Sequence, residues 1–536
     1  MNVGTKCTLY FKCQKLKDTD TFSKSDPYVV LYRNDGTRLS RVGRTETINN
    51  NLNPIFQTTI EVEYFFETKQ DFVLKLYDYD GHKNDDQNDA LGVVTFTLAH
   101  IMCSRGHTKE FPIPPPGKGS VTITAVDHAA TREDTIELHL YGRKMRKMDF
   151  IGASDPYYTL HRLLPNKQMQ LLYTSEVISD NLNPDWKPQP KLRVGQLMGA
   201  DSSEKTILLQ CYDKDVFGHK GMGSVIVSVD DLLNASHDPN LCFPLVKENK
   251  KQNQYGNIHV KLCKIVKAIT FSDLLSLGWQ VNMVAAVDFT ASNGDPKDLR
   301  SLHFYNPQQP NEYVRAMWSV GEILMDYDSD KNIPAFGFGA MMPDGQVSHH
   351  FHLNLEPNPY VQGMPGLLDA YQRAISTVKL YGPTNFAPTI QATAVGARQA
   401  EVDHIYTILL IITDGEITDI DDTIDALVDA DDVAMSIIIV GVGHGCDFAA
   451  MDQLDGDNAA LVSRRGRRSR RDLVQFVPMR EFANRPPAAL AAEVLREVPA
   501  QVERWALIKG MDRAQMFPNV PVQVAPSAPP PQKTAA

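Results

Sequence analysis

The sequence has 536 residues, of which 43% are hydrophobic, and its formal net charge at pH 7 is −11. At about 100–200 residues per domain, this length predicts three to four domains. The negative charge argues against bulk attraction to nucleic acid or anionic lipid, so binding to such a surface must rest on local charge or bound cations. No apolar run approaches the ~18–20 residues of a membrane-spanning helix.

The amino-terminal residues and the cysteines favour a cytosolic protein. The segment MNVGTKCTLYFKCQKL lacks the apolar core and cleavage site of a secretory signal, and it also lacks the glycine needed for myristoylation. Seven cysteines are scattered without a CxxC pair or a regular spacing. Such usage is typical of reduced thiols and not of a disulfide framework.

Three short patterns occur twice in the same order in the first half of the chain. They are KSDPYV and ASDPYY at 24–29 and 153–158, NNNLNPIF and SDNLNPDW at 49–56 and 179–186, and KLYDYD and QCYDKD at 75–80 and 210–215. A repeat of about one domain length predicts two tandem domains of one type. Between the patterns lie short β-like segments such as YVVLYR and FVLKLYD, which predict antiparallel β-sandwiches.

The pattern changes after about residue 270. Apolar, strand-like runs such as VNMVAAVDF, IYTILLIITDG and AMSIIIVGVG alternate with helix-like segments such as NEYVRAMWSVGEILMDY. This alternation predicts an α/β doubly wound (Rossmann-like) domain, with a parallel sheet covered by helices on both faces. The last stretch, NVPVQVAPSAPPPQKTAA, has the composition of a disordered tail.

Each repeat carries two groups of aspartates that are far apart in the sequence. If both groups lie at one end of the sandwich, four or five carboxylates converge and repel one another. A hard cation with 6–8 oxygen ligands removes this repulsion, and Ca²⁺ suits ligands on irregular loops better than Mg²⁺. The alternative is that aspartates simply favour turns, but two loops matched twice in order argue against it.

The SDPY, NLNP and YDxD patterns resemble those of C2 domains, in which loop aspartates hold Ca²⁺ and the occupied tip docks on anionic phospholipid. The resemblance implies the following calcium ligands: Asp20, Asp26, Asp78, Asp80 and one of Asp86 or Asp89 in the first domain, and Asp149, Asp155, Asp213 and Asp215 in the second. Asp89 fits the family pattern better than Asp86. In the second domain, His219, Lys220 and Gly221 stand where a last acid is expected, which puts its calcium affinity in doubt.

Basic and apolar residues lie in or next to the loops expected to bind calcium in the second domain. The candidates for lipid contact are Arg143, Lys144, Arg146, Lys147, Phe150 and Phe217. A basic residue near an anionic membrane contributes about 1 kcal/mol, and exposed apolar tips insert. The alternative is a solvated charge run whose apolar neighbours pack inward.

Oxygen-bearing side chains follow two strands of the third domain. VDFTAS supplies Asp288, Thr290 and Ser292, YGPTNFAP supplies Thr384, and IITDG supplies Asp414. The carboxyl edge of an open α/β sheet is where ligands bind. Two acids and three hydroxyls suit Mg²⁺, which keeps waters that an outside ligand can replace. The alternative is that these residues only cap helices and turns.

This set resembles the metal-ion-dependent adhesion site of von Willebrand factor A domains. Two C2 domains followed by such a domain, with DFTASNGDP, YGPTNFAP and LDGD, resemble the copine family. The resemblance implies a non-enzymatic cytosolic protein that binds anionic membranes when Ca²⁺ rises and recruits intracellular proteins through an A domain holding Mg²⁺ or Mn²⁺. We expect these domains: 1–127, first C2; 128–265, second C2; 266–275, linker; 276–510, A domain; 511–536, tail.

Two other functions fit parts of the sequence. An enzyme recruited by its C2 domains would need a catalytic constellation, and no GxSxG, HExxH or CxxC pattern occurs. An extracellular adhesion protein would need a secretory signal. The arginine-rich stretch SRRGRRSRR at 463–471 is expected to be an exposed loop, a second lipid contact or a nuclear-import signal.

Overall fold

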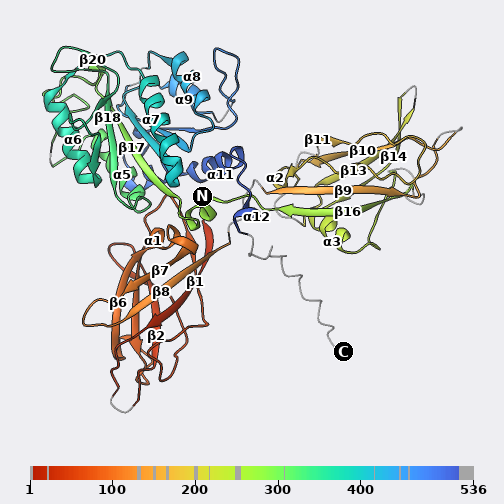
Figure 1. Cartoon of the computed structure of the whole chain (residues 1–536), viewed down its shortest axis with the longest axis horizontal. Helices are drawn as coiled ribbons and strands as arrows, with labels where there is room; N and C mark the ends of the chain where they lie inside the picture. Colours follow the sequence, from red (N-terminus) through yellow and green to blue (C-terminus); the bar gives the residue numbers. More distant parts are fainter. Residues whose placement is uncertain are drawn as a thin grey trace. The chain divides into compact units, whose positions relative to one another are not determined.

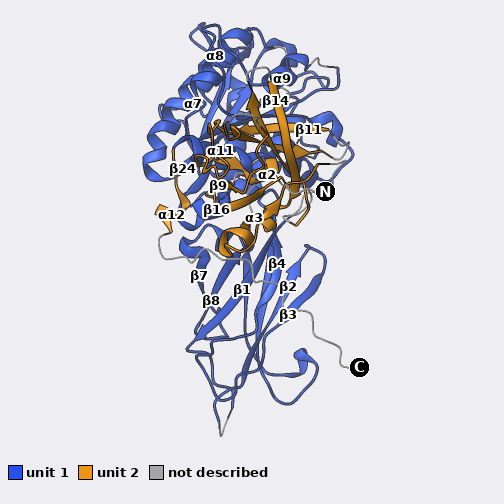
Figure 2. Cartoon of the chain, turned by 90° about the vertical axis from the view of Figure 1, so that its right-hand side faces the viewer, with its two compact units in different colours: residues 1–129, 270–509 blue, residues 130–269, 510–536 orange. Residues whose placement is uncertain are grey.

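The computed structural model describes residues 4–20, 23–128, 134–148, 152–164, 168–197, 203–215, 218–247, 255–306, 308–415, 417–445, 448–456 and 459–517. The chain forms two compact units (Figure 2). One unit contains residues 1–129 and 270–509, and the other contains residues 130–269 and 510–536. The first C2-like repeat therefore belongs to the same unit as the α/β domain.

Residues 4–128 form a sandwich of two four-stranded antiparallel sheets (Figure 1), with strand orders β4-β1-β8-β7 and β3-β2-β5-β6. Buried and exposed side chains alternate along β4, as expected for a strand with one face on the core. Helix α1 (Leu98–Met102) follows β6. The strands are β1 (Thr5–Gln14), β2 (Pro27–Asn34), β3 (Leu39–Arg44), β4 (Ile60–Tyr64), β5 (Asp71–Asp78), β6 (Ala90–Thr97), β7 (Thr108–Pro112) and β8 (Ser120–Asp127).

The second repeat forms a matching sandwich with strand orders β12-β9-β16-β15 and β11-β10-β13-β14. Its core includes the fully buried Trp186, which packs edge-on against Tyr158. Its helices are α2 (Val194–Leu197) and α3 (Val229–His237). Its strands are β9 (Thr135–Arg143), β10 (Pro156–Leu163), β11 (Met169–Thr174), β12 (Leu192–Arg193), β13 (Ile207–Asp215), β14 (Gly218–Val227), β15 (Phe243–Pro244) and β16 (Asn257–Val266).

The NLNP pattern has the same structural role in both sandwiches. Asn53 Oδ1 accepts a hydrogen bond of 2.9 Å from the backbone N–H of Lys15, and Asn183 Oδ1 accepts one of 3.0 Å from that of Lys144. Both lysines have a positive φ, 54° and 53°. The asparagine therefore stabilises a left-handed residue at the entrance to the first tip loop, which explains why this pattern repeats.

The third domain is built on a mostly parallel sheet with the order β21-β18-β17-β24-β25-β26. Neighbours from β18 to β26 are parallel, whereas β21 and β22 pair antiparallel with β18. The strands of the main sheet are β17 (Gln280–Asp288), β18 (Asn332–Phe338), β21 (Phe351–His352), β22 (Tyr360–Gln362), β24 (Ile405–Thr413), β25 (Met435–Gly441) and β26 (Val474–Pro478). A small sheet contains β19 (Ala340–Met341), β20 (Val347–Ser348) and β23 (Lys379–Leu380).

Helices cover both faces of this sheet, and β24 and β25 are consequently almost entirely buried. Helices α7, α8 and α9 share one apolar core cluster with the central strands. Helices α5, α6, α10 and α11 contact β17, β18, β25 or β26. The helices are α4 (Phe271–Ser276), α5 (Glu312–Leu324), α6 (Gly363–Thr377), α7 (Ala387–Ala400), α8 (Ile420–Asp429), α9 (Ala449–Leu454), α10 (Pro487–Leu495), α11 (Val498–Ile508) and α12 (Arg513–Met516).

Buried aromatic side chains join the first sandwich to the α/β domain. The hydroxyl oxygens of Tyr64 and Tyr327 are 2.7 Å apart, and the ring of Phe66 packs edge-on against Phe271 and Tyr327. His107 Nε2 lies 3.0 Å from the hydroxyl of Ser272. The contacts of Tyr64 and Phe66 lie where β4 ends and before β5 begins, and that of His107 lies just before β7. This end of the sandwich is opposite to Asp78, because β5 runs from the seam towards that aspartate.

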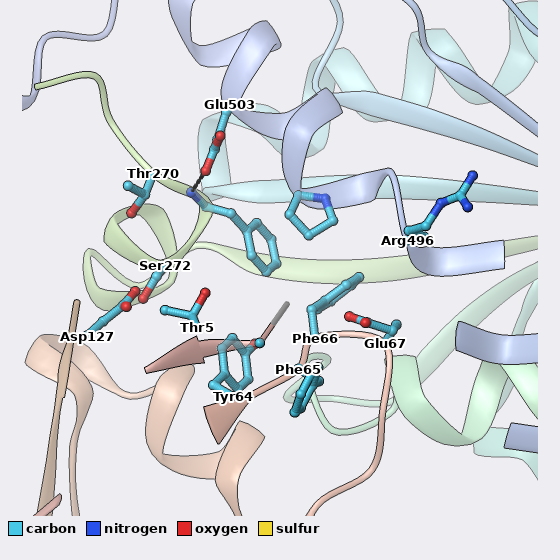
Figure 3. A pocket seen from close by; sticks show the side chains of 13 residues that line it. Thr5, Tyr64, Phe65, Phe66, Glu67, Asp127, Thr270, Ser272, Arg496 and Glu503 are labelled. Atoms are coloured by element: carbon cyan, nitrogen blue, oxygen red, sulfur yellow. Dashed lines mark hydrogen bonds between the residues drawn. The ribbon is translucent and has the colours of Figure 1, made fainter. Parts of the chain in front are cut away.

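A recess of about 260 Å³ lies in the same seam (Figure 3). Polar and aromatic side chains line it, including Tyr64, Phe66 and Asp127 from the sandwich and Phe271 and Glu503 from the α/β domain. None of the predicted calcium or magnesium ligands is among its lining residues. The recess is therefore a feature of the packing between the two domains and separate from the candidate metal centres.

The predicted fold class is confirmed: two β-sandwiches precede a mostly parallel α/β domain. Helix α4 lies partly in the segment expected as a linker, and its first turn is held by a capping box between Thr270 and Asp273. In the segment expected as a tail, α12 is helical, and residues 518–536 lie outside the described residues. Among the helices described, none is long and apolar enough to cross a membrane.

Candidate metal centres

The two aspartate groups of the first sandwich meet at one end of it. Asp26 directly precedes β2, and Asp78 is the last residue of β5, which pairs with β2 so that Pro27 lies opposite Asp78. The backbone N–H of Asp26 donates to Asp78 Oδ1 over 2.5 Å. Carboxylate oxygens of Asp20, Asp78 and Asp80 all lie within 4.8 Å of one another. The predicted convergence of the two loops is therefore present.

Backbone and hydroxyl groups orient these carboxylates. The hydroxyl of Thr19 donates to Asp78 Oδ2 over 2.5 Å, and the N–H of Asn50 donates to Asp26 Oδ1 over 2.7 Å. The N–H of Asp89 donates to Asp80 Oδ2 over 2.8 Å. Sequence reasoning did not identify Thr19, since a threonine in a loop carries no distinctive pattern.

The three acids in the longer loop, residues 85–89, have different surroundings. Asp86 Oδ1 accepts a hydrogen bond of 3.0 Å from the hydroxyl of Tyr77 and lies 3.7 Å from Lys75 Nζ. Asp85 pairs with Arg41 at 3.1 Å. Asp89 is joined by hydrogen bonds of its backbone to Asp78 and Asp80. The Asp86 side chain is thus engaged by Tyr77 and Lys75, whereas the backbone of Asp89 lies beside Asp78 and Asp80.

The second sandwich repeats this frame closely. The N–H of Asp155 donates a hydrogen bond of 2.6 Å to Asp213 Oδ1. Asp155 Oδ1 in turn accepts a hydrogen bond of 2.7 Å from the N–H of Asp180. Asp213 is fully buried. Asp215, however, forms an ion pair with Lys220 at 2.7 Å between Oδ2 and Nζ. Asp149, Phe150 and Phe217 lie outside the described residues.

The basic residues before the second tip are only partly available to an outside ligand. The guanidinium of Arg143 donates to the carbonyls of Gly142 and Asn183 and lies 4.4 Å from the centre of the Tyr141 ring. Arg143 is half-buried, whereas Lys144, Arg146 and Lys147 are all exposed. The surface candidates for anionic headgroups are therefore these last three.

In the α/β domain, the predicted ligands gather at the carboxyl edge of the sheet. Asp288 is the last residue of β17, and Asp414 directly follows the neighbouring parallel strand β24. Asp288 Oδ1 accepts hydrogen bonds from the N–H and hydroxyl of Thr290 at 2.8 and 2.6 Å. The hydroxyls of Thr290 and Ser292 are 2.9 Å apart.

The loop that carries Thr384 is attached to the same edge. The N–H of Ala291 donates to the carbonyl of Tyr381 over 2.8 Å, and the carbonyl of Thr384 accepts from the hydroxyl of Thr418 over 2.8 Å. Gly339 lies beneath Thr290 with a φ of +75°, and a Cβ there would come within 2.4 Å of the threonine Cγ2. The close approach of these loops thus depends on a glycine.

Burial and the charge of Asp414 raise the pKa of the Asp288 carboxyl to about 7. Both aspartates are buried, so two negative charges at this edge are unfavourable without a compensating cation. Two acids together with the hydroxyls of Thr290, Ser292 and Thr384 form the hard oxygen donor set that Mg²⁺ accepts. The residues present therefore fit the implied metal.

Three residues that the sequence did not reveal support Asp288. The hydroxyl of Thr413 donates to Asp288 Oδ2 over 2.7 Å. Burial lowers the pKa of His303 to about 3, so its ring is neutral, and its Nε2–H donates to the Asp288 carbonyl over 2.8 Å. The ring of Tyr313 stacks on His303 with the centroids 4.3 Å apart. Thr413 could have been found from its place beside Asp414, but His303 carries no local signal.

The arginine-rich stretch 463–471 is held by acids of its own domain. Arg464 pairs with Asp422 and Asp425, Arg467 with Asp429, and Arg470 with Asp431. Arg471 is buried and donates to the carbonyls of Asp431, Val433 and Met435. Most of this stretch is thus occupied in binding helix α8 and the residues that follow it, which disfavours a continuous basic surface.

Comparisons with known proteins identify the same succession of domains. Residues 7–113 and 134–245 match the C2 domain family, and residues 301–514 match the family described as Copine. A solved structure titled BON1-C2B is 19% identical, with a TM-score of 0.22, and the match covers 25% of this chain and 92% of that one. A structure of two C2 domains of Extended-Synaptotagmin 2 is 17% identical, with a TM-score of 0.21, and the match covers 49% of this chain and 92% of that one. With two tandem C2 domains followed by a copine domain, the chain belongs to the copine family.

Proposed function

We propose that this protein binds anionic phospholipid membranes when Ca²⁺ rises, and that the tip of the first C2 domain is the calcium switch. The observation that carries the proposal is the group of carboxylate oxygens from Asp20, Asp78 and Asp80 within 4.8 Å of one another. The proposed ligands are Asp20, Asp26, Asp78, Asp80 and Asp89.

The proposed calcium switch acts by changing the charge of the tip. Five carboxylates at one tip repel both one another and an anionic lipid surface. Calcium binding removes the repulsion within the cluster and brings positive charge to the tip, where lipid headgroup oxygens can complete a shell of 6–8 ligands. In this scheme the protein resides in the cytosol and moves to the plasma membrane or internal membranes as Ca²⁺ rises.

The test is a calcium titration of pelleting with vesicles that contain phosphatidylserine. We expect the full chain to pellet with Ca²⁺ and to be released by a chelator. Asp26→Asn combined with Asp80→Asn removes two charged ligands and should raise the required Ca²⁺ concentration sharply. An unchanged calcium dependence in this variant would exclude the first tip as the switch.

We further propose that the A domain recruits a protein partner through a bound Mg²⁺ or Mn²⁺. Asp288, Thr290, Ser292, Thr384 and Asp414 would hold the metal. Two carboxylates and neutral hydroxyls leave coordination positions for water. An acidic side chain of another protein can replace one such water. The buried surroundings of Asp288 support this assignment, since its pKa is raised to about 7 by burial and by Asp414.

The partner proposal is tested by pull-down from cell extract in Mg²⁺ and in chelator. Asp288→Ala should abolish metal-dependent capture because it removes a charged ligand, whereas Thr384→Ala should weaken capture because it removes only a hydroxyl. Neither variant should change calcium-dependent vesicle binding, since the seam with the A domain lies at the opposite end of the first sandwich from the calcium tip. Equal capture in every condition would contradict a metal bridge.

A further inference from the structure

The two C2 domains differ at one structurally equivalent position next to the candidate calcium ligands. In the first domain, the pairing of β5 with β6 shifts register between Leu76 and Tyr77, and Tyr77 lies opposite Ala90. In the second, the pairing of β13 with β14 shifts between Cys211 and Tyr212, and Tyr212 lies opposite Gly221. The same irregularity therefore aligns the two hairpins residue by residue at the tip.

This alignment places Lys220 at the position of Asp89. Asp89 immediately precedes Ala90 and joins Asp78 through a backbone hydrogen bond of 2.8 Å. Lys220 immediately precedes Gly221 and lies opposite Asp213, the counterpart of Asp78. The connection in the second domain is shorter, and its strands pair as far as Asp215 and Gly218. The acid-bearing segment of the first loop is thus replaced by a lysine.

The lysine contacts a predicted calcium ligand directly. Its Nζ lies 2.7 Å from Oδ2 of Asp215, the counterpart of Asp80. In the first domain, the same carboxylate oxygen of Asp80 accepts a hydrogen bond from the neutral N–H of Asp89. The second tip therefore has one carboxylate fewer and one ammonium group more, at a position where the first tip offers an acid.

We propose that Lys220 acts as a tethered cation that competes with Ca²⁺ for the carboxylates of the second C2 domain. The inference rests on the proposed calcium chemistry of C2 tips but concerns a different domain. The ammonium group partly neutralises the acids and repels an incoming divalent cation. The second tip is then less responsive to Ca²⁺, and its charge at rest is less negative than that of the first tip.

A role in calcium competition is distinguishable from a role in fold stability. The side chains of Lys220 and Asp215 are 45% and 33% exposed, and ion pairs this accessible contribute little to folding. Removal of the ammonium group should consequently leave the melting temperature in chelator nearly unchanged. Its effect should instead appear when Ca²⁺ is added.

The experiment is a calorimetric calcium titration of the full chain in which Asp26→Asn and Asp80→Asn weaken the first tip. Added to this background, Lys220→Gln should tighten the remaining calcium binding about tenfold, as expected from loss of one repelling charge at close range. Lys220→Asp should tighten it further because it restores the acid found in the first domain. The matched control is Lys214→Gln, which removes an exposed lysine of the same hairpin.

Unchanged or weaker calcium binding in both Lys220 variants, or equal tightening in the Lys214 control, would overturn the proposal. A change of melting temperature in chelator as large as that in Ca²⁺ would show that the ion pair is structural, and would also overturn it. Failure of the proposed function is a separate result, since it is judged from the calcium dependence of vesicle binding with Lys220 intact.

Discussion

The two C2 domains share one frame and differ in the charge that the frame carries. In each, a backbone N–H donates to the aspartate at the equivalent strand position, Asp78 or Asp213, at 2.5 and 2.6 Å. The aspartate two residues later then accepts a hydrogen bond from a peptide N–H in the first domain (Asp80) and pairs with an ammonium group in the second (Asp215). The repeated fold thus carries different charged groups at equivalent positions of the two tips.

The domains also differ in how they belong to the molecule. The first sandwich is part of the same compact unit as the A domain, with Tyr64 and Tyr327 buried between them, whereas the second forms a unit of its own. The tip that we propose as the calcium switch therefore belongs to the unit that also contains the A domain. We interpret the first as the calcium-responsive tip and the second as a tip with a weaker calcium response.

The largest effect is expected when the first tip is made like the second. Asp89→Lys removes one acid and adds an ammonium group beside Asp80, so the Ca²⁺ concentration needed for vesicle binding should rise about 100-fold or more. The measurement is vesicle pelleting across a calcium titration. Asp86→Lys makes the same change in charge on the side chain that contacts Lys75 and Tyr77, and should have a much smaller effect. A larger effect at Asp86 would reverse the assignment of the fifth ligand.

An intermediate effect is expected at the basic approach to the second tip. Lys144, Arg146 and Lys147 precede the tip loop, and each basic residue contributes about 1 kcal/mol near an anionic membrane. Replacing all three by Gln should weaken the calcium-independent binding of the full chain to phosphatidylserine vesicles at low salt by about 100-fold. Raising the salt to about 1 M, where the Debye length is about 3 Å, should release the wild type as well. Salt-insensitive binding would contradict this electrostatic role.

The smallest effect concerns the seam within the first unit. Tyr64→Phe and Tyr327→Phe each remove one hydroxyl from a buried pair 2.7 Å apart. Each variant should lower the stability of the unit by about 1–3 kcal/mol, since the hydrogen bond between the two hydroxyls is lost. Tyr64→Phe should be the milder change, because the Tyr327 hydroxyl also donates to the carbonyl of Phe66 over 3.4 Å. The double variant should be less destabilised than the sum of the two, which thermal unfolding of all four proteins measures. Additive losses would mean that the two hydroxyls do not interact.

Sequence patterns located both loops of the first tip and the sheet edge because SDPY, YDxD and DxTxS are local and each lies at the start or the end of a strand. That these residues bind metal stays a prediction. The patterns left Asp86 and Asp89 unresolved, because that choice depends on the contacts of Asp86 with Tyr77 and Lys75. They also left out His303, which reaches Asp288 only through the fold. The seam was not predictable either, since Tyr64 and Tyr327 are distant in the sequence and show no pattern beyond burial.

The arginine-rich stretch is a second case in which the sequence did not reveal the contacts of its residues. The stretch is expected to be an exposed loop, and most of it is exposed, but Arg464, Arg467 and Arg470 pair with acids along and just after α8. The acids that neutralise them lie about 40 residues earlier in the sequence, and all but Asp431 belong to α8, which also packs on the sheet. Local composition could not reveal this pairing, because it depends on which elements the sheet brings together.

The most direct test of the calcium switch is a calorimetric titration of the full chain with Ca²⁺ for matched variants of the two tips. Asp26→Asn with Asp80→Asn changes the first tip, and Asp155→Asn with Asp215→Asn makes the corresponding change in the second. Our account predicts that the tightest calcium binding disappears in the first variant and is retained in the second. Loss of the tightest binding in the second variant, with retention in the first, would contradict it.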